Sequence, residues 1–234
     1  MGEHTVSSFD EELEHIDRLI HDMGDLSGSM VSSSTAALLQ SDSALAQRVI
    51  SDDAIMDAKQ RELDDRAITL IARRQPMAQD LRSVVGAIRM AADLERIGDL
   101  AKNIAKRVGA VGETATPKAL AHSIENMSSL VLNQVYGVVR AYVARDAEGL
   151  STLRADDEKV DIKYTAVFRE LLTYMMEDPR NISACTHLLF CAKNLERIGD
   201  HVTNIAENAY YVITGSQLPP YRPKSDETSV ALAE

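Results

Sequence analysis

The chain has 234 residues and a formal net charge of −11, from 25 basic and 36 acidic side chains. This acidic balance argues against a nucleic-acid partner, because a phosphate backbone needs a basic face. Aromatic residues make up only 4% of the chain and glycine and proline are few, a composition that favours long helices over strands.

Features of the sequence also indicate a compartment. No apolar run approaches the roughly 20 residues that a membrane span requires, and the polar first ten residues do not resemble a signal peptide. Cys185 and Cys191 lack a CxxC spacing and are expected to be buried thiols in a reducing compartment. We therefore expect a cytoplasmic protein without a transmembrane segment, which meets the membrane only through partners.

Capping and breaking residues divide the chain into six predicted helices. The first three occupy residues 9–39, 42–74 and 76–108, the fourth begins at Thr116-Pro117, and the last two occupy 146–176 and 178–215. Aspartates at the starts of three helices serve as expected N-caps (Asp42, Asp146 and Asp178), and a proline follows the last of them.

A repeated block shows that one structural unit is present twice. Leu94-Glu95-Arg96-Ile97-Gly98-Asp99 returns 101 positions later as Leu195-Glu196-Arg197-Ile198-Gly199-Asp200. Positions in the preceding helices align at 104 instead, which places three extra residues in the turn near Pro76. The sequence thus predicts two tandem, pseudo-symmetric three-helix bundles. We expect the first over residues 1–108, a linker over 109–116, the second over 117–215, and a disordered tail over 216–234.

The third helix of each bundle carries an apolar seam with steps of three and four residues, typical of antiparallel helix packing. The seam consists of Ala87, Met90, Leu94, Ile97, Ala101, Ile104 and Val108 in the first half, and of Leu188, Cys191, Leu195, Ile198, Val202, Ile205 and Ala209 in the second. Gly98 and Gly199 interrupt these helices at equivalent places and indicate close approach of another helix. Arg96 and Arg197 are expected to form salt bridges with neighbours on their own helix.

Paired carboxylates are the main candidate site. Glu95 and Asp99 share one helix face, which is opposite the seam, so we expect them to point outward. The full set contains four residues per half, with two amides as possible supporting ligands: Asp53, Asp57, Glu95 and Asp99 with Asn103, and Asp157, Asp161, Glu196 and Asp200 with Asn204. Asp52 and Asp156 offer an alternative register for the looser pairs. Clustered carboxylates repel unless cations neutralise them, and hard ions such as Mg²⁺, Ca²⁺, Mn²⁺ or iron suit oxygen ligands.

The doubled block, with Asn-Ile-Ala after each copy at 103–105 and 204–206, resembles the PhoU family of bacterial phosphate-transport regulators. The resemblance covers residues 9–215 and implies two three-helix bundles. It also implies that the eight carboxylates can hold multinuclear iron or zinc clusters, as in some family members. We further expect a homodimer.

The resemblance implies a non-enzymatic negative regulator of phosphate uptake and of the phosphate-starvation (Pho) response. Such a protein couples the importer's ATPase, a PstB-like subunit, to a PhoR-like sensor histidine kinase. One alternative is a carboxylate-bridged metalloenzyme, either an oxidase or a phosphoester hydrolase. Di-iron bundles use two Glu-x-x-His motifs, and only Glu12 and His15 have that spacing. Metal storage is a further alternative.

Overall fold

The computed structural model describes residues 2–111 and 118–218. Every element in these ranges is a helix, and most of the helices are long. In chain order they are α1 (Gly2–Gln40), α2 (Ser43–Arg74), α3 (Gln79–Ala105), α4 (Val108–Val111), α5 (Lys118–Val143), α6 (Ala147–Ala155), α7 (Asp157–Glu177), the 3₁₀ turn η1 (Pro179–Asn181) and α8 (Ile182–Thr214). The predicted all-α class is confirmed.

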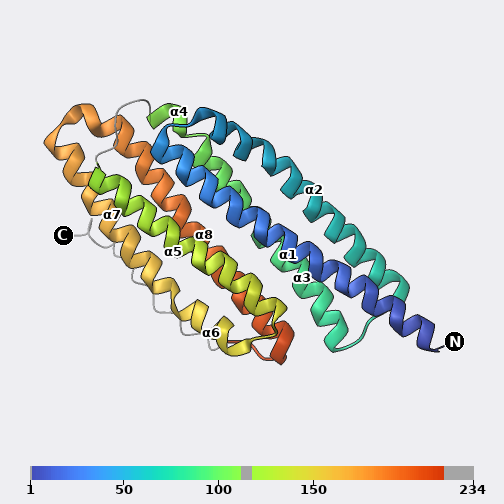
Figure 1. The fold of residues 1–234 in the computed structure, drawn as a ribbon. Coiled ribbons are helices and arrows are strands. Elements are labelled where there is room, and N and C mark those ends of the chain that lie inside the picture. Colours follow the sequence, from blue (N-terminus) through green and yellow to red (C-terminus); the bar gives the residue numbers. More distant parts are fainter. Residues whose placement is uncertain (1, 112–117, 219–234) are drawn as a thin grey trace.

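The helices form two bundles that lie side by side (Figure 1). In the first half α1, α2 and α3 pack against one another, and in the second half α5 and α8 pack with α6 and α7. The halves meet where α3 lies against α8 and α1 lies against α5, while α2 and α7 form the outer edges (Figure 1). The predicted pair of three-helix bundles is therefore confirmed, and their buried apolar side chains join into one core.

The apolar seams account for this packing. Every predicted seam residue on α3, α8 and α4 is buried, with at most 4% of its surface exposed. Both cysteines are free and buried, as expected. Each seam points into the core, so the polar row on the same helix must lie on a different face. This row consists of Glu95 and Asp99 on α3, and of Glu196 and Asp200 on α8.

Three glycines on α3 and α8 mark close helix contacts. A Cβ atom added to Gly98 would lie 3.3 Å from Cγ of Met56 on α2, and one added to Gly199 would lie 3.4 Å from Oδ1 of Asp157 on α7. The close approach predicted for both glycines is confirmed. The tightest of the three contacts joins the halves, because a Cβ on Gly86 of α3 would lie 2.2 Å from Cγ2 of Val212 on α8.

Helix boundaries follow the predicted caps in part. The side chains of Asp42 and Asp146 accept hydrogen bonds from the amides of Leu45 and Gly149, each at 2.9 Å. The Asp178 carboxylate caps η1 through the amide of Arg180, so α8 begins only after this turn.

Two predicted helices are shorter than expected. The predicted helix over 146–176 is divided into α6 and α7 at Asp156, whose carbonyl accepts a bond from Gln134 Nε2 at 3.1 Å. The predicted helix over 76–108 ends at Ala105, and the short helix α4 follows it. The expected cap at Thr116-Pro117, most of the 109–116 linker and the tail from residue 219 lie outside the described residues. The domain boundaries therefore stay predictions.

Candidate functional site

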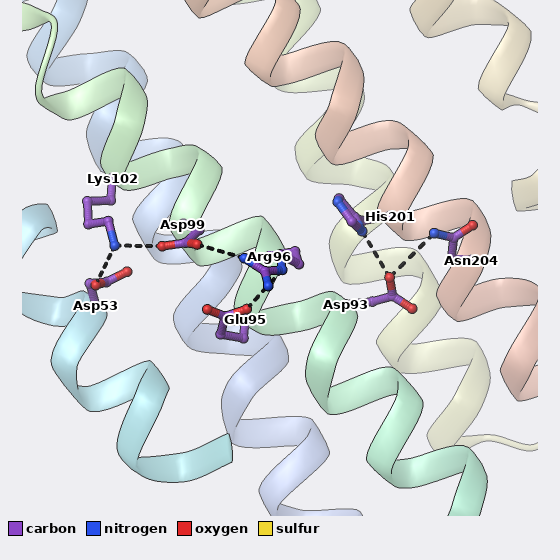
Figure 2. Close-up of polar contacts among 8 residues, drawn as sticks. All are labelled: Asp53, Asp93, Glu95, Arg96, Asp99, Lys102, His201 and Asn204. Atoms are coloured by element: carbon purple, nitrogen blue, oxygen red, sulfur yellow. Dashed lines mark hydrogen bonds and ion pairs between the residues drawn. The ribbon is translucent and has the colours of Figure 1, made fainter. Parts of the chain in front are cut away.

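In the first half, two of the predicted carboxylates converge on a lysine. Lys102 Nζ lies 2.7 Å from Oδ2 of Asp53 on α2 and 2.5 Å from Oδ1 of Asp99 on α3 (Figure 2). Burial lowers the pKa of Lys102, but the hydrogen bonds to the two carboxylates outweigh it and raise the pKa. The chain's own ammonium group thus stands where a bound cation would neutralise this pair.

Arg96 supplies the second cation of this cluster. Its Nε lies 3.5 Å from Oε2 of Glu95 and its NH1 lies 3.2 Å from Oδ2 of Asp99 (Figure 2). Burial and the neighbouring Asp99 charge nevertheless raise the pKa of Glu95. Asp57 is half-buried nearby, and its backbone carbonyl accepts a bond from Arg61. The salt bridges expected of Arg96 are confirmed, whereas Arg197 makes no ion pair with a described residue.

The second-half carboxylates are buried, which corrects the outward orientation expected from the helical geometry. Asp157, Asp161 and Glu196 expose 3%, 5% and 7% of their surface, and Asp200 is half-buried. The physical reason is the absent side chain at Gly199, which lets the start of α7 pack directly over the polar row of α8. Position on a helix face specified which residues group together, but not whether another helix covers them.

Glu196 is incompletely neutralised. Lys193 Nζ donates to its Oε1 at 2.8 Å, while its Oε2 is buried without a hydrogen-bond partner among the described residues. Burial raises the pKa of Glu196; Lys193 lowers it, and Asp200 and Asp161 raise it further. A buried polar atom left without a partner costs about 1–3 kcal/mol, so this oxygen marks a place where a cation would be stabilising.

The two halves therefore differ in the side chains that neutralise their carboxylates. No group of three or more His, Cys, Asp or Glu residues within 2–111 and 118–218 is arranged to hold one. In the first half, Lys102 already bridges Asp53 and Asp99. The equivalent of Lys102 in the second half is Thr203, which carries no charge, and the cation that meets Glu196 there is Lys193.

The predicted supporting amides do not join the carboxylate clusters. Asn103 is exposed, and Asn204 Nδ2 instead donates to Oδ1 of Asp93 on α3 at 3.4 Å. His201 Nδ1 lies 2.9 Å from the same oxygen, so Asp93 joins the two halves at this position (Figure 2). Sequence reasoning missed this contact because the repeat places Asn194, not an acid, at the position equivalent to Asp93.

Comparison with known proteins places this geometry in a family. The model of the PhoU domain matches residues 20–108 and 124–209. The chain belongs to the PhoU domain family. The two matched segments correspond to the two bundles and contain all eight candidate carboxylates.

Curated relatives share this similarity over almost their whole length. The chain is 56% identical over 226 residues to a "phosphate-specific transport system accessory protein PhoU homolog" of Rhizobium meliloti, covering 97% of this chain and 95% of the relative. It is 49% identical over 229 residues to a homologue of the same description from Caulobacter vibrioides, covering 98% of this chain and all of the relative.

Solved structures of PhoU proteins have the same fold as this chain. The crystal structure of PhoU from Pseudomonas aeruginosa superposes with a TM-score of 0.85 at 36% identity, covering 89% of this chain and all of that one. The phosphate transport system regulatory protein PhoU from Streptococcus pneumoniae superposes with a TM-score of 0.83 at 27% identity, covering 90% of this chain and 99% of that one.

None of the helices described for this chain has the length and apolar character needed to cross a membrane.

Proposed function

We propose that this chain is an accessory regulator of phosphate transport that restrains uptake and the phosphate-starvation response when phosphate is plentiful. The observation that carries the proposal is near full-length similarity, at 56% identity, to a phosphate-specific transport accessory protein. In this role it acts as an adaptor between the importer's ATPase, a PstB-like subunit, and a PhoR-like sensor histidine kinase. It works at the inner face of the membrane and as a homodimer.

The geometry at the sole Glu-x-x-His spacing favours an adaptor over a di-iron enzyme. His15 Nε2 lies 3.4 Å from Oε1 of Glu62 on α2, and Glu12 pairs with Arg74 on the same helix at 3.5 Å. Both side chains therefore serve the packing of α1 on α2. Their surroundings do not form the inward-facing ligand set on which a carboxylate-bridged oxidase depends.

Metal binding belongs to the proposal as a second property. The buried Asp157, Asp161 and Glu196, with the half-buried Asp200, would hold an ion, and Glu196 Oε2 is the atom most in need of one. The set around Asp53 and Asp99 would do so only after Lys102 moves aside. Resemblance favours iron or zinc, and oxygen ligands alone would also accept Mg²⁺, Mn²⁺ or Ca²⁺. Bound metal would neutralise the carboxylates and stiffen the contact of α7 with α8.

Co-purification tests the adaptor role. The full chain is expressed with the importer ATPase and the sensor kinase of its own organism, with phosphate plentiful, and each partner is sought in the purified complex. The proposal expects both to be recovered. Recovery of neither, with a folded chain, would remove the adaptor function.

Elemental analysis tests the metal separately. The natively purified chain is compared with the Glu196→Gln variant and with Glu95→Gln as the matched first-half change. A greater loss of metal in Glu196→Gln supports the preference for the second half. Equal and negligible metal in all three proteins would leave the carboxylates as packing and solvation groups.

A further inference from the structure

Two adjoining clefts lie between α3 and α8, beside the carboxylate clusters described above. They have volumes of about 680 and 390 Å³ and share Arg89, Glu207 and Asn208 in their linings. We call this continuous surface the arginine trough; it runs from Arg89 to Arg96 on α3 and from Asn204 to Leu218 beside it, with Arg154 of α6 at one end. Among its side chains, Arg96 also pairs with Glu95 and Asp99 of the first-half cluster, and the metal and adaptor proposals use none of the others.

The residues lining the trough carry one net positive charge in an otherwise acidic protein, from Arg89, Arg96 and Arg154 against Asp93 and Glu207. Arg82, Arg89 and Arg96 recur every seven residues, so they lie along one side of α3 about 10 Å apart. Arg89 forms no ion pair or hydrogen bond with any residue that the structure describes. Arg82 lines neither cleft but lies next to them: its guanidinium is 5.9 Å above the ring of the lining residue Tyr211, and its Nε is buried without an acceptor among the described residues.

Both carboxylates in the trough already have partners. Glu207 accepts from Arg154 Nε at 2.8 Å, and Asp93 accepts from His201 and Asn204. Because these carboxylates bond to Arg154, His201 and Asn204, they leave the guanidinium of Arg89 available to a ligand. Because they also lie close to Arg89, they disfavour a compact, highly charged anion and favour a ligand whose carboxylates are spaced apart.

The opposite end of the α3–α8 interface shows that the fold does not require an open trough. The repeat places Phe190 at the position equivalent to Arg89, and Arg107 at the position equivalent to Asn208. The guanidinium of Arg107 lies 4.3 Å from the Phe190 ring centre and its NH1 lies 3.0 Å from His187 Nδ1. At that end the chain therefore pairs its own arginine across the interface, whereas Arg89 has no such partner within residues 2–111 and 118–218.

We propose that the arginine trough binds an acidic helical segment of a protein partner, with Arg89 and Arg96 facing its carboxylates. Glutamates one heptad apart on a helix match the spacing of the two arginines. Asn208 and Tyr211 supply uncharged polar contacts, and arginine with tyrosine is the composition of binding hot spots. The inference rests on the adaptor role proposed above and names the face that performs it.

A peptide-binding assay tests the trough without the natural partner. The probe is a fluorescent, alanine-rich synthetic helix with glutamates at seven-residue intervals, and the matched peptide carries lysines at those positions. Fluorescence anisotropy at low ionic strength is measured with the full chain, with Arg89→Glu and Arg89→Gln, and with Arg18→Glu as control. Arg18 is exposed on α1 and lines neither cleft, and its reversal changes the net charge equally.

We expect the chain to bind the glutamate peptide and not the lysine peptide. Arg89→Glu should weaken the affinity for the glutamate peptide about tenfold, and Arg89→Gln should weaken it less. Arg18→Glu should change this affinity less than about twofold. Equal effects of Arg89→Glu and Arg18→Glu would overturn the proposal, as would equal binding of both peptides. Displacement by inorganic phosphate, but not by chloride of equal ionic strength, would overturn it in favour of a small-anion site. If co-purification of the unaltered chain recovers a partner that Arg89→Glu also retains, the trough is refuted while the adaptor role stands.

Discussion

Replacing Lys102 with methionine tests whether the chain's own cation holds the first-half carboxylates together. Asp53 and Asp99 contact the same nitrogen at 2.7 and 2.5 Å, so the two contacting oxygens lie no more than about 5 Å apart. Two negative charges at that separation repel by about 3 kcal/mol at an effective dielectric constant of 20. Solvent at Asp99, whose side chain is 28% exposed, reduces this repulsion, and methionine restores apolar contact. We expect the free energy of unfolding to fall by about 2 kcal/mol at pH 7.

Urea denaturation in metal-free buffer measures this loss, and a second titration with Mn²⁺ asks whether a metal replaces the ammonium group. The Lys102→Met variant should regain stability as Mn²⁺ is added, more than the unaltered chain does. Lys59→Met is the matched control, because Lys59 meets a single, half-exposed partner, Asp22, at 2.8 Å, and its loss should cost less than about 1 kcal/mol. Equal stability of Lys102→Met and the unaltered chain would show that Lys102 does not hold the two carboxylates together, and no response to Mn²⁺ would show that a metal does not replace its ammonium group.

Three further predictions concern packing and burial. Gly86→Leu should lower the free energy of unfolding by at least about 2 kcal/mol, because its Cβ would meet Val212; in the same denaturation assay Gly109→Ala, with open space around it, should change little. Burial, and then the Asp65 charge, raise the pKa of Asp64, so ionised Asp64 disfavours the folded state at neutral pH. Asp64→Asn should therefore stabilise the fold at pH 7 by less than about 1 kcal/mol, and the gain should vanish as the pH falls below 3.8, the ordinary aspartate pKa. Burial raises the pKa of Cys191 to about 12, so thiol reagents at pH 8 should modify it only after denaturation; rapid native labelling would contradict its burial.

Local pattern was enough to predict the architecture. The seam on each third helix repeats in steps of three and four, and such a period requires one buried face whatever the partner helix is. Asp42 and Asp146 were recognisable as caps because a capping carboxylate bonds to an amide only a few residues ahead. The doubled block identified the pseudo-symmetry because both copies keep the same spacing.

The chemistry of the candidate site depended on tertiary contacts that no local pattern records. Lys102 was a plain helix residue in the sequence, and only the approach of α2 brings Asp53 to it. Glu196 was expected at the surface, and only the packing of α7 near Gly199 buries it. Arg89 stands out only when its position is compared with Phe190 across the interface. Two halves that share an identical six-residue block thus fold alike, but their charges are neutralised in different ways.

A regulatory role in phosphate transport is tested by measuring phosphate uptake in cells that lack this chain, with phosphate plentiful and together with a phosphate-starvation reporter. We expect unrestrained uptake and an active reporter, both corrected by the unaltered chain and by Arg18→Glu but not by Arg89→Glu. Unchanged uptake and a silent reporter in the deletion strain would contradict a regulatory role in phosphate transport.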